Sequence, residues 1–143
     1  MVLNEIQIKE VSWQFASLSL REIRSEVFIM EQGVPEALEW DGLDNGCTHL
    51  LAITPDNIPV GTVRLLADGH IGRMAVKRTW RNKGVGKALL LRIMEVARIQ
   101  GIKVAMLNAQ TTARGFYEKF GFRAEGNEFL DAGIPHYKML REL

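Results

Sequence analysis

The segment with the clearest chemical potential is a glycine-rich turn at residues 81–87, which reads RNKGVGK. Glycines permit close backbone approach and unusual dihedral angles. The turn leads into the strongest helical pattern of the chain, and a helix N-terminus offers unpaired N–H groups and the positive end of the helix dipole. Three side chains add formal positive charge: Arg81, Lys83 and Lys87. This combination is typical of a site that binds phosphate groups.

Two widespread phosphate-binding motifs fit this turn poorly. A Walker A loop needs a glycine at position 81 and a Ser or Thr after Lys87, where this chain has Arg81 and Ala88. The dinucleotide motif Gly-x-Gly-x-x-Gly lacks its last glycine, because Leu89 stands there. Readings as an NTPase or a Rossmann domain are therefore weak.

The elements that must position this turn alternate between strand and helix patterns, which indicates an α/β layered domain. The length of 143 residues suits a single domain, residues 1–143. We expect strands at residues 2–11, 48–54, 58–66, 71–76 and 102–107, and two more within 122–143 around a turn at 131–133. We expect helices at residues 12–30, capped by Ser12, at 85–100 and at 111–120, with a loop or short helix at 36–46.

Composition excludes several classes of protein. Apolar residues make up 47% and charged residues 24%, the usual balance of a soluble globular domain. A single cysteine, Cys47, excludes an internal disulfide, and three scattered histidines make a metal site unexpected. No signal-like start and no apolar run of about 18 residues is visible. We therefore expect a cytoplasmic protein without a membrane partner.

Charge is distributed unevenly, although the net charge is only +1. Residues 25–63 hold seven acids and no Lys or Arg, whereas residues 72–103 hold nine bases and one acid. One part suits a cation and the other an anion, or the two are solvated faces that neutralise each other. Nucleic-acid binding by residues 72–103 is a weak reading, because that strand and helix should be largely buried.

At this point the sequence resembles a known family. Residues 81–86, Arg-x-x-Gly-x-Gly, are similar to the pyrophosphate-binding motif of the GNAT superfamily of acetyl-CoA-dependent N-acyltransferases. Residues 116–122, FYEKFGF, resemble the second signature of that family. Further segments resemble the ElaA/YjcF-like branch of bacterial GNAT proteins: residues 27–32, 39–44, 107–110 and 129–136.

The resemblance implies a mixed, mostly antiparallel sheet flanked by helices on both faces. It implies transfer of an acetyl group from acetyl-CoA to a primary amine by direct attack in a ternary complex, with no metal. It also makes a homodimer possible. Many relatives carry a glutamate on the strand before the loop, but residues 71–73 read IGR. This departure motivates the alternative of an acyl-CoA-binding regulatory module with little or no catalysis.

The resemblance also implies where the cofactor lies, with its pyrophosphate on the turn and its pantetheine arm along the preceding strand. The residues expected to bind it are Met74, Ala75, Val76, Arg81, Asn82, Lys83, Gly84, Val85, Gly86, Lys87, Asn108, Gln110 and Tyr117. Gln110 falls where many relatives place an Asn that meets the pantetheine. Asn108 or Thr111 has an equally plain alternative as a helix cap.

Two residues are expected to be catalytic by this resemblance. Tyr117 stands at the position of the family's general acid for the leaving thiolate, although it also suits packing beside its aromatic neighbours. Glu31 is our first choice as general base. The other candidates are Glu39, Asp41, Asp44, His49, His70 and His136. An imidazole such as that of His136 can accept a proton from a substrate near neutral pH, although a lone histidine is more often structural. The carboxylates of residues 39–44 could instead attract a protonated amine or form a solvated loop.

Overall fold

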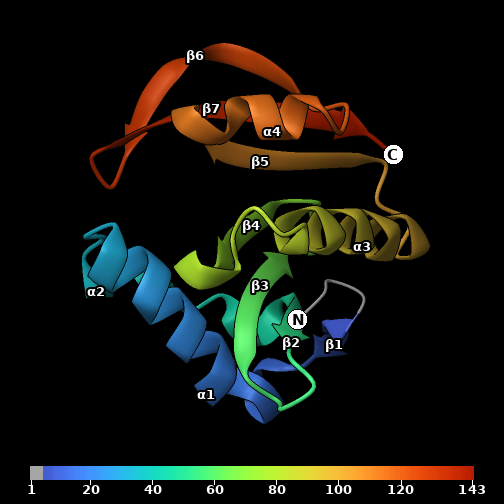
Figure 1. Cartoon of the computed structure of the whole chain (residues 1–143). Helices are drawn as coiled ribbons and strands as arrows, with labels where there is room; N and C mark the ends of the chain where they lie inside the picture. Colours follow the sequence, from blue (N-terminus) through green and yellow to red (C-terminus); the bar gives the residue numbers. More distant parts are fainter. Residues whose placement is uncertain (1–4) are drawn as a thin grey trace.

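The structure, a computed structural model, describes residues 5–143 (Figure 1). Its elements in chain order are β1 (Gln7–Val11), α1 (Trp13–Arg24), the π-helical η2 (Ser25–Glu31), α2 (Glu36–Glu39), η3 (Asp44–Gly46), β2 (Thr48–Ile53), β3 (Pro59–Leu65), β4 (Ile71–Val76), η4 (Arg78–Trp80), α3 (Val85–Ile99), β5 (Val104–Gln110), η5 (Thr111–Ala113), α4 (Arg114–Glu118), β6 (Arg123–Asp131) and β7 (Ile134–Glu142). No helix in this described part is both long and apolar enough to cross a membrane.

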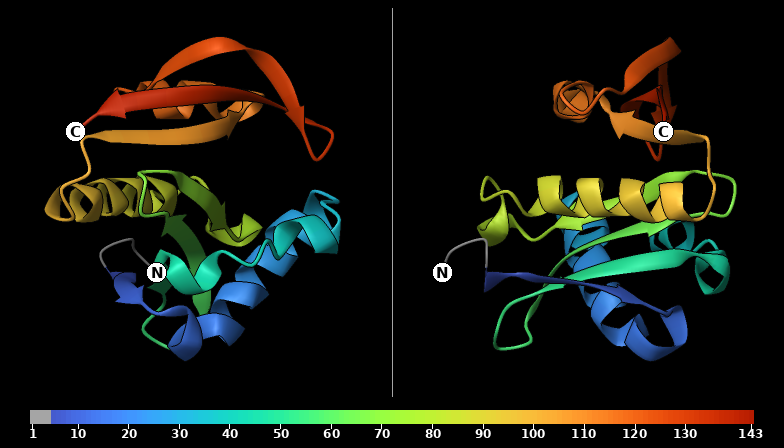
Figure 2. Two further views of the ribbon diagram at one scale, coloured as in Figure 1. Left: turned by 180° about the vertical axis from the view of Figure 1, so that it is seen from behind. Right: turned by 90° about the vertical axis from the view of Figure 1, so that its right-hand side faces the viewer.

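The strands form two antiparallel sheets, ordered β1–β2–β3–β4 and β5–β7–β6. They are joined by a parallel bridge between His70 and Met106, beyond which β4 and β5 diverge (Figure 2). The register of β4 against β3 shifts opposite residues 62–64, and Arg73 takes a φ of 52°. Such a bulge bends a strand and ends its regular pairing. The predicted α/β fold with antiparallel strands is confirmed, with its sheet divided in two.

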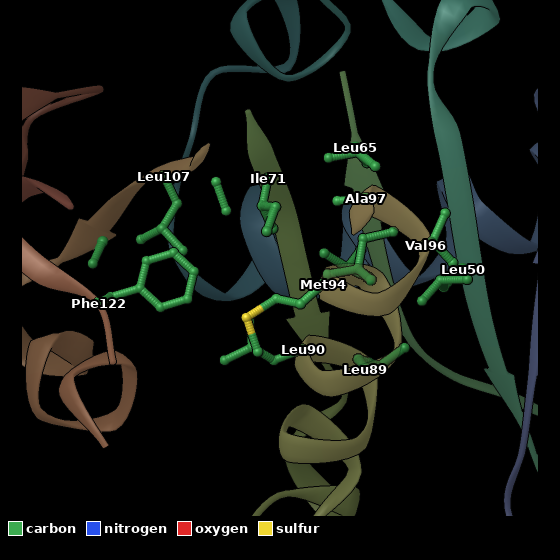
Figure 3. Close-up of a cluster of buried hydrophobic side chains, with 14 of the residues drawn as sticks. Leu50, Leu65, Ile71, Leu89, Leu90, Met94, Val96, Ala97, Leu107 and Phe122 are labelled. Atoms are coloured by element: carbon green, nitrogen blue, oxygen red, sulfur yellow. The ribbon is translucent and has the colours of Figure 1, made fainter. Parts of the chain in front are cut away.

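Helices α1 and α3 cover opposite faces of the first sheet, as predicted. Because side chains alternate along a strand, Leu50 packs in the cluster around α3 and Leu51 in the cluster around α1. Figure 3 shows Leu50 beside Leu89 of α3. A Cβ on Gly61 would lie 3.1 Å from the Leu89 Cδ1 atom. Glycine at this position therefore lets α3 lie close to β3 and fixes the start of the helix near the end of β4.

The N-terminal predictions hold in outline. Ser12 caps α1, since its hydroxyl accepts a hydrogen bond from the Phe15 N–H at 3.2 Å. The predicted helix 12–30 is continuous, but it changes from α to π geometry at Ser25. Residues 2–4 of the first predicted strand lie outside the described residues. The expected short helix in residues 36–46 is present as α2 and η3.

The region after α3 differs more from the prediction. The strand predicted at residues 102–107 continues to Gln110, so Asn108 lies within β5 and not at a helix start. The helix predicted at residues 111–120 is a short 3-10 turn followed by α4. Residue Ala113 precedes α4 without a side-chain cap, so neither Asn108 nor Thr111 caps it. Cross-strand pairing with β7 extends β5 beyond its apolar run.

Candidate active site

A cavity of about 480 Å³ lies where β4 and β5 diverge. Its walls come from β4, β5, α4, the β6–β7 turn and the segment from Phe28 to Glu39. Four of the residues expected to bind the cofactor line it together, Met74, Asn108, Gln110 and Tyr117, and so do three of the candidate bases, Glu39, His70 and His136. The turn at residues 81–87 and Glu31 are not among its lining residues. The predicted residues therefore fall into two places, the cavity and the loop beyond the end of β4.

The edge of β4 that faces the cavity offers free backbone groups. β4 pairs with β3 on one side, and its pairing with β5 in the described residues is limited to the bridge at His70. An unpaired strand edge presents N–H and C=O groups to a ligand. The carbonyl of Val76 is an exception, because it accepts a hydrogen bond from the Arg81 Nε at 2.8 Å. Met74 remains on the open part of this edge, whereas Ala75 is buried and its backbone faces β3, so the prediction that Ala75 binds the cofactor gains no support.

Tyr117 connects α4 to this edge. Its hydroxyl lies 3.7 Å from the Met74 Sδ atom. Its ring contacts Phe116 and Phe122 edge-on, with centroids 5.1 and 6.0 Å away. Burial raises the pKa of Tyr117 to about 12. The side chain thus packs among aromatic residues and also carries a protonated hydroxyl to the cavity, so both interpretations of this residue fit its position.

We call residues 77–86 the glycine loop. The Lys77 N–H donates to the Val60 carbonyl at 2.9 Å, and a 3-10 turn follows. Gly84 precedes α3 with a φ of 85°, a conformation that glycine adopts without strain. Gly86 is different, because a Cβ there would meet only the Phe116 Cζ at 3.8 Å and the Val76 Cγ2 at 3.9 Å.

The fold itself therefore does not require a glycine at position 86. Glycine in a helix interior is less favourable than alanine by about 1 kcal/mol. A bare backbone at this point suits a ligand that approaches the first turn of α3 closely. The open surface over Gly86, at the N-terminus of a 15-residue helix, fits a pyrophosphate group.

Arg81 and Glu31 form a bidentate ion pair. The Arg81 Nη1 and Nη2 atoms donate to the two carboxylate oxygens of Glu31 at 2.6 and 2.7 Å. The hydrogen bonds from Arg81 hold the pKa of Glu31 below its ordinary value, and the same bonds raise the pKa of Arg81. Arg81 thus fastens the glycine loop to η2. Glu31 lies at this junction and not at the cavity, so the arrangement gives no support to a role as general base.

We call residues 36–44 the acidic wall, because Leu38 and Glu39 line the cavity and the segment carries the carboxylates of Glu39, Asp41 and Asp44. Arg24 is almost fully buried and donates to Glu39 and Asp44 at 2.7 Å each. The carbonyl of Asp44 also accepts a hydrogen bond at 2.8 Å from His49. Burial opposes ionisation of Asp44, but hydrogen bonds from the arginines outweigh it and lower its pKa.

Two more arginines complete this network. Arg64 donates to Asp41 and to Asp44 at 3.0 Å each, and its hydrogen bonds hold the pKa of Asp41 far below the ordinary value. Arg73 lies 3.1 Å from Glu39 and 3.2 Å from Asp41. The carboxylates of the acidic wall are therefore paired with arginines, which gives no support to the expectation that they attract a protonated amine.

The three histidines occupy different environments. His49 is buried and lies 5.6 Å from the Trp13 ring, and burial lowers its pKa. His70 lies at the bridge to β5, with its Nδ1 2.9 Å from Asp68. His136 lines the cavity from β7. Within residues 5–143, no three His, Cys, Asp or Glu side chains gather in a way that could hold a metal ion.

Comparison with known proteins decides the family. A family model described as "Acetyltransferase (GNAT) domain" matches residues 7–143. The chain belongs to the GNAT acetyltransferase family. Proteins of this family transfer acetyl groups from acetyl-CoA to an acceptor nitrogen. The GNAT fold accounts for the divergence of β4 and β5 and for the loop before α3.

Individual GNAT relatives support the same branch that the motifs indicated. The chain is 36% identical to the N-acetyltransferase YjcF of Bacillus subtilis over 143 residues, which cover 97% of this chain and 95% of the relative. The crystal structure of Escherichia coli ElaA matches with a TM-score of 0.85 and 28% identity, over 96% and 99% of the two chains. An acyl-CoA N-acyltransferase from Pseudomonas aeruginosa matches with a TM-score of 0.83 and 30% identity, over 95% and 97%.

Sequence reasoning missed Arg64 and Arg73, which line the cavity of this GNAT domain and hold the acidic wall. One signal was available for Arg64. Arg24 and Arg64 directly flank the interval 25–63, which contains acids but no Lys or Arg. Arg73 had no comparable signal, because its partners lie more than thirty positions away along the chain.

Proposed function

We propose that this protein transfers the acetyl group of acetyl-CoA to a primary amine by direct attack within a ternary complex. The observation that carries the proposal is the position of the Tyr117 hydroxyl, 3.7 Å from Met74 on the open edge of β4 and beside the cavity. A proton donor, free backbone groups and space for an acceptor meet at this point. Thioester aminolysis needs these three features.

The glycine loop holds the pyrophosphate of the donor. The backbone N–H groups of Gly84, Val85 and Gly86 begin α3 and point outward from its free end. Lys83 and Lys87 are exposed beside them, and Lys83 lies 5.3 Å from the centre of the Trp80 ring. Arg81 mainly holds the glycine loop in position, because its guanidinium already donates hydrogen bonds to Val76 and Glu31. Asn82 is exposed in the turn, with a φ of 60°.

The open edge of β4 at Met74 receives the pantetheine arm, and a backbone N–H of this edge stabilises the oxyanion. The amides of Asn108 and Gln110 approach the arm from β5. Tyr117 donates its proton to the leaving sulfur. Its raised pKa keeps it protonated until the thiolate forms.

Direct attack is favoured over a covalent acyl-enzyme by the position of the single cysteine. The Cys47 thiol donates to the Leu43 carbonyl at 3.2 Å and is not among the cavity-lining residues. Burial raises the pKa of the Cys47 thiol, which disfavours the nucleophilic thiolate. The acceptor amine therefore enters the cavity and attacks the thioester itself.

The first test is thermal unfolding with acetyl-CoA, with ATP and NAD as controls. Ligand at about 100 times its Kd adds roughly 2.7 kcal/mol, which raises Tm by about 5–10 °C for a domain of this size. A rise with acetyl-CoA alone supports the donor site. No rise at millimolar acetyl-CoA would overturn the proposal.

Turnover is tested by thiol release with a panel of primary amines. Replacing the proton donor in Tyr117→Phe should lower kcat by about 10²-fold or more, because the sulfur then leaves without its proton. Tyr137→Phe is the matched control, since Tyr137 is the other tyrosine and packs against Arg114 outside the cavity. Donor binding without turnover of any amine would instead identify an acyl-CoA-binding regulatory module.

A further inference from the structure

His136 lies opposite the reaction centre that the proposed function places at Met74. β4 and β5 run parallel from the bridge between His70 and Met106. Met74 and Gln110 each lie four residues along the chain beyond that bridge, on the two sides of the divergence. His136 is the cross-strand neighbour of Gln110, and both line the cavity. The imidazole thus lies one strand, about 5 Å, beyond the far edge of the cleft.

The tautomer of this imidazole follows from its hydrogen bond. The His136 Nδ1 lies 2.6 Å from the Ile134 carbonyl oxygen. A carbonyl only accepts, so Nδ1 carries the hydrogen and the lone pair of the neutral ring is on Nε2. The ring stacks on Phe129 at 26°, with centroids 5.9 Å apart. Within residues 5–143, no hydrogen bond engages Nε2, although only 9% of the residue is exposed.

We propose that His136 is the general base of the transfer and removes the proton of the acceptor amine at Nε2. This assignment rests on the proposed function and adds to it the residue that receives the acceptor nitrogen. His136 is already oriented as a base for a substrate in the cavity, because its tautomer is fixed, its ring is stacked and it lines the cavity. Catalytic histidines in other enzymes are oriented in the same manner by a bond to the second nitrogen.

The other titratable or charged side chains that line this cavity are Glu39, Arg64, His70, Arg73, Tyr117 and Asp131. Glu39 is buried, and its carboxylate pairs with Arg24 and Arg73. His70 lies at the closed end of the divergence and has Asp68 2.9 Å from its Nδ1. Asp131 is exposed at the end of β6. His136 differs from His70 in lying beside Gln110, away from the closed end of the cleft.

The step balances without another reagent. The nitrogen of the neutral amine forms the C–N bond with the acetyl carbonyl carbon, and the C–S bond of the thioester breaks. His136 Nε2 takes the proton that the nitrogen loses, and the Tyr117 hydroxyl gives a proton to the sulfur. Water then returns a proton from His136 to the Tyr117 oxygen. Both side chains end in their starting states, and the products are an amide and free coenzyme A.

The test compares His136→Gln with Lys138→Gln, since Lys138 is exposed two positions along β7 and is not among the cavity-lining residues. Release of thiol from acetyl-CoA is measured with spermidine, with glycinamide, with an Nα-acetyllysine amide and with water alone as acceptor. At neutral pH we expect His136→Gln to lower kcat by about 10²-fold with an unchanged KM for acetyl-CoA. We expect Lys138→Gln to stay within about twofold of the wild type, since it removes no group that the step uses.

A structural role and a base role differ in two further readouts. The wild-type rate should fall on acidification as imidazole is protonated, and the His136→Gln rate should lack this fall. Added imidazole should restore part of the rate in His136→Ala. A loss of equal size at every pH, with no rescue and a raised KM for acetyl-CoA, would assign His136 to packing alone. If His136→Gln does not fold, as judged by circular dichroism, His136→Asn replaces it.

Nitrogen NMR of labelled protein bound to coenzyme A gives a readout that needs no turnover. We expect Nδ1 of His136 to carry the hydrogen and Nε2 to be unprotonated in the neutral ring. The reverse tautomer would overturn the assignment. Full activity of His136→Gln would overturn it and leave the proposed function intact. If no acceptor, water included, releases thiol from the wild type, the proposed function fails and the base assignment fails with it.

Discussion

The glycine loop beyond β4 and the acidic wall beside the cavity are held in place by different interactions. The loop is shaped by its backbone: a 3-10 turn, a left-handed Gly84 and the bond from Lys77 to β3. The wall is held by side chains, through three carboxylates that pair with Arg24, Arg64 and Arg73. Local backbone geometry thus shapes the loop, and long-range charge pairing shapes the wall.

The wall also stabilises the bulge that opens the cleft. Arg73 has a φ of 52°, which is uncommon for a residue with a long side chain. Its guanidinium donates to the carbonyls of Leu38 and Glu39 at 3.3 and 3.1 Å. Because these bonds tie the bulged residue to the wall, the divergence of β4 from β5 depends on the same charges that hold the wall.

The largest expected effect is the loss of a buried arginine from the wall. Arg24→Ala leaves Glu39 and Asp44 buried without their partner, and removing one member of a buried pair typically destabilises by about 3–5 kcal/mol. Urea denaturation measures this change. Arg98→Ala is the control, because Arg98 is exposed on α3 and should change the unfolding free energy by less than about 0.5 kcal/mol. If the two variants lost the same unfolding free energy, Arg24 would contribute no more to stability than an exposed surface arginine.

The second prediction addresses the loop. Gly86→Leu should raise the Kd for coenzyme A by more than about tenfold, or 1.4 kcal/mol, because the side chain fills the space over the first turn of α3. The fold should persist, since a Cβ there has room against Phe116 and Val76. Gly46→Leu is the control at an exposed glycine with open space around it. Calorimetric titration with coenzyme A measures both, and an unchanged Kd for Gly86→Leu contradicts the loop assignment.

The difference between local and long-range interactions also explains why the loop could be predicted from the sequence and the wall could not. The loop was predictable because its signals are adjacent: glycines, basic residues and a helix start occupy residues 81–87. The wall was not, because Arg24 and Glu39 are 15 positions apart, and Arg64 and Asp41 are 23 apart. Charge counts over an interval do not show which side chains meet across it. The extension of β5 to Gln110 was missed for a similar reason, since pairing with β7 sets its length.

Acid should weaken the wall. The pKa values of Asp41 and Asp44 are lowered in the folded protein from an ordinary value of 3.8. A lowered pKa contributes stability above the unfolded-state pKa, and this contribution is lost as the pH falls toward the folded-state value. The unfolding free energy should therefore decrease below about pH 5. Denaturation at a series of pH values measures the slope, which should be shallower in Asp41→Asn and unchanged in Asp56→Asn, a turn residue.

The smallest effect is expected at Glu31, where the loop meets η2. Its pair with Arg81 is partly exposed, with side-chain exposures of 23% and 34%, so Glu31→Gln should change stability by only about 0.2–1 kcal/mol. If Glu31 only positions Arg81, kcat should stay near the wild-type value. If Glu31 were the base, kcat should fall by about 10²-fold, because Gln cannot take a proton.

Glu26→Gln serves as the matched control, since Glu26 lies on the same π-helical segment and forms no ion pair among the described residues. Thiol release and urea denaturation are measured on all three proteins. A large fall in kcat confined to Glu31→Gln would identify Glu31, and not His136, as the general base. A small change in both measurements would mean that the glycine loop keeps its shape through its backbone even when its ion pair is weakened. The wall is held by side-chain charges and not by its backbone. We therefore expect Arg24→Ala to cause the largest loss of unfolding free energy and Glu31→Gln the smallest.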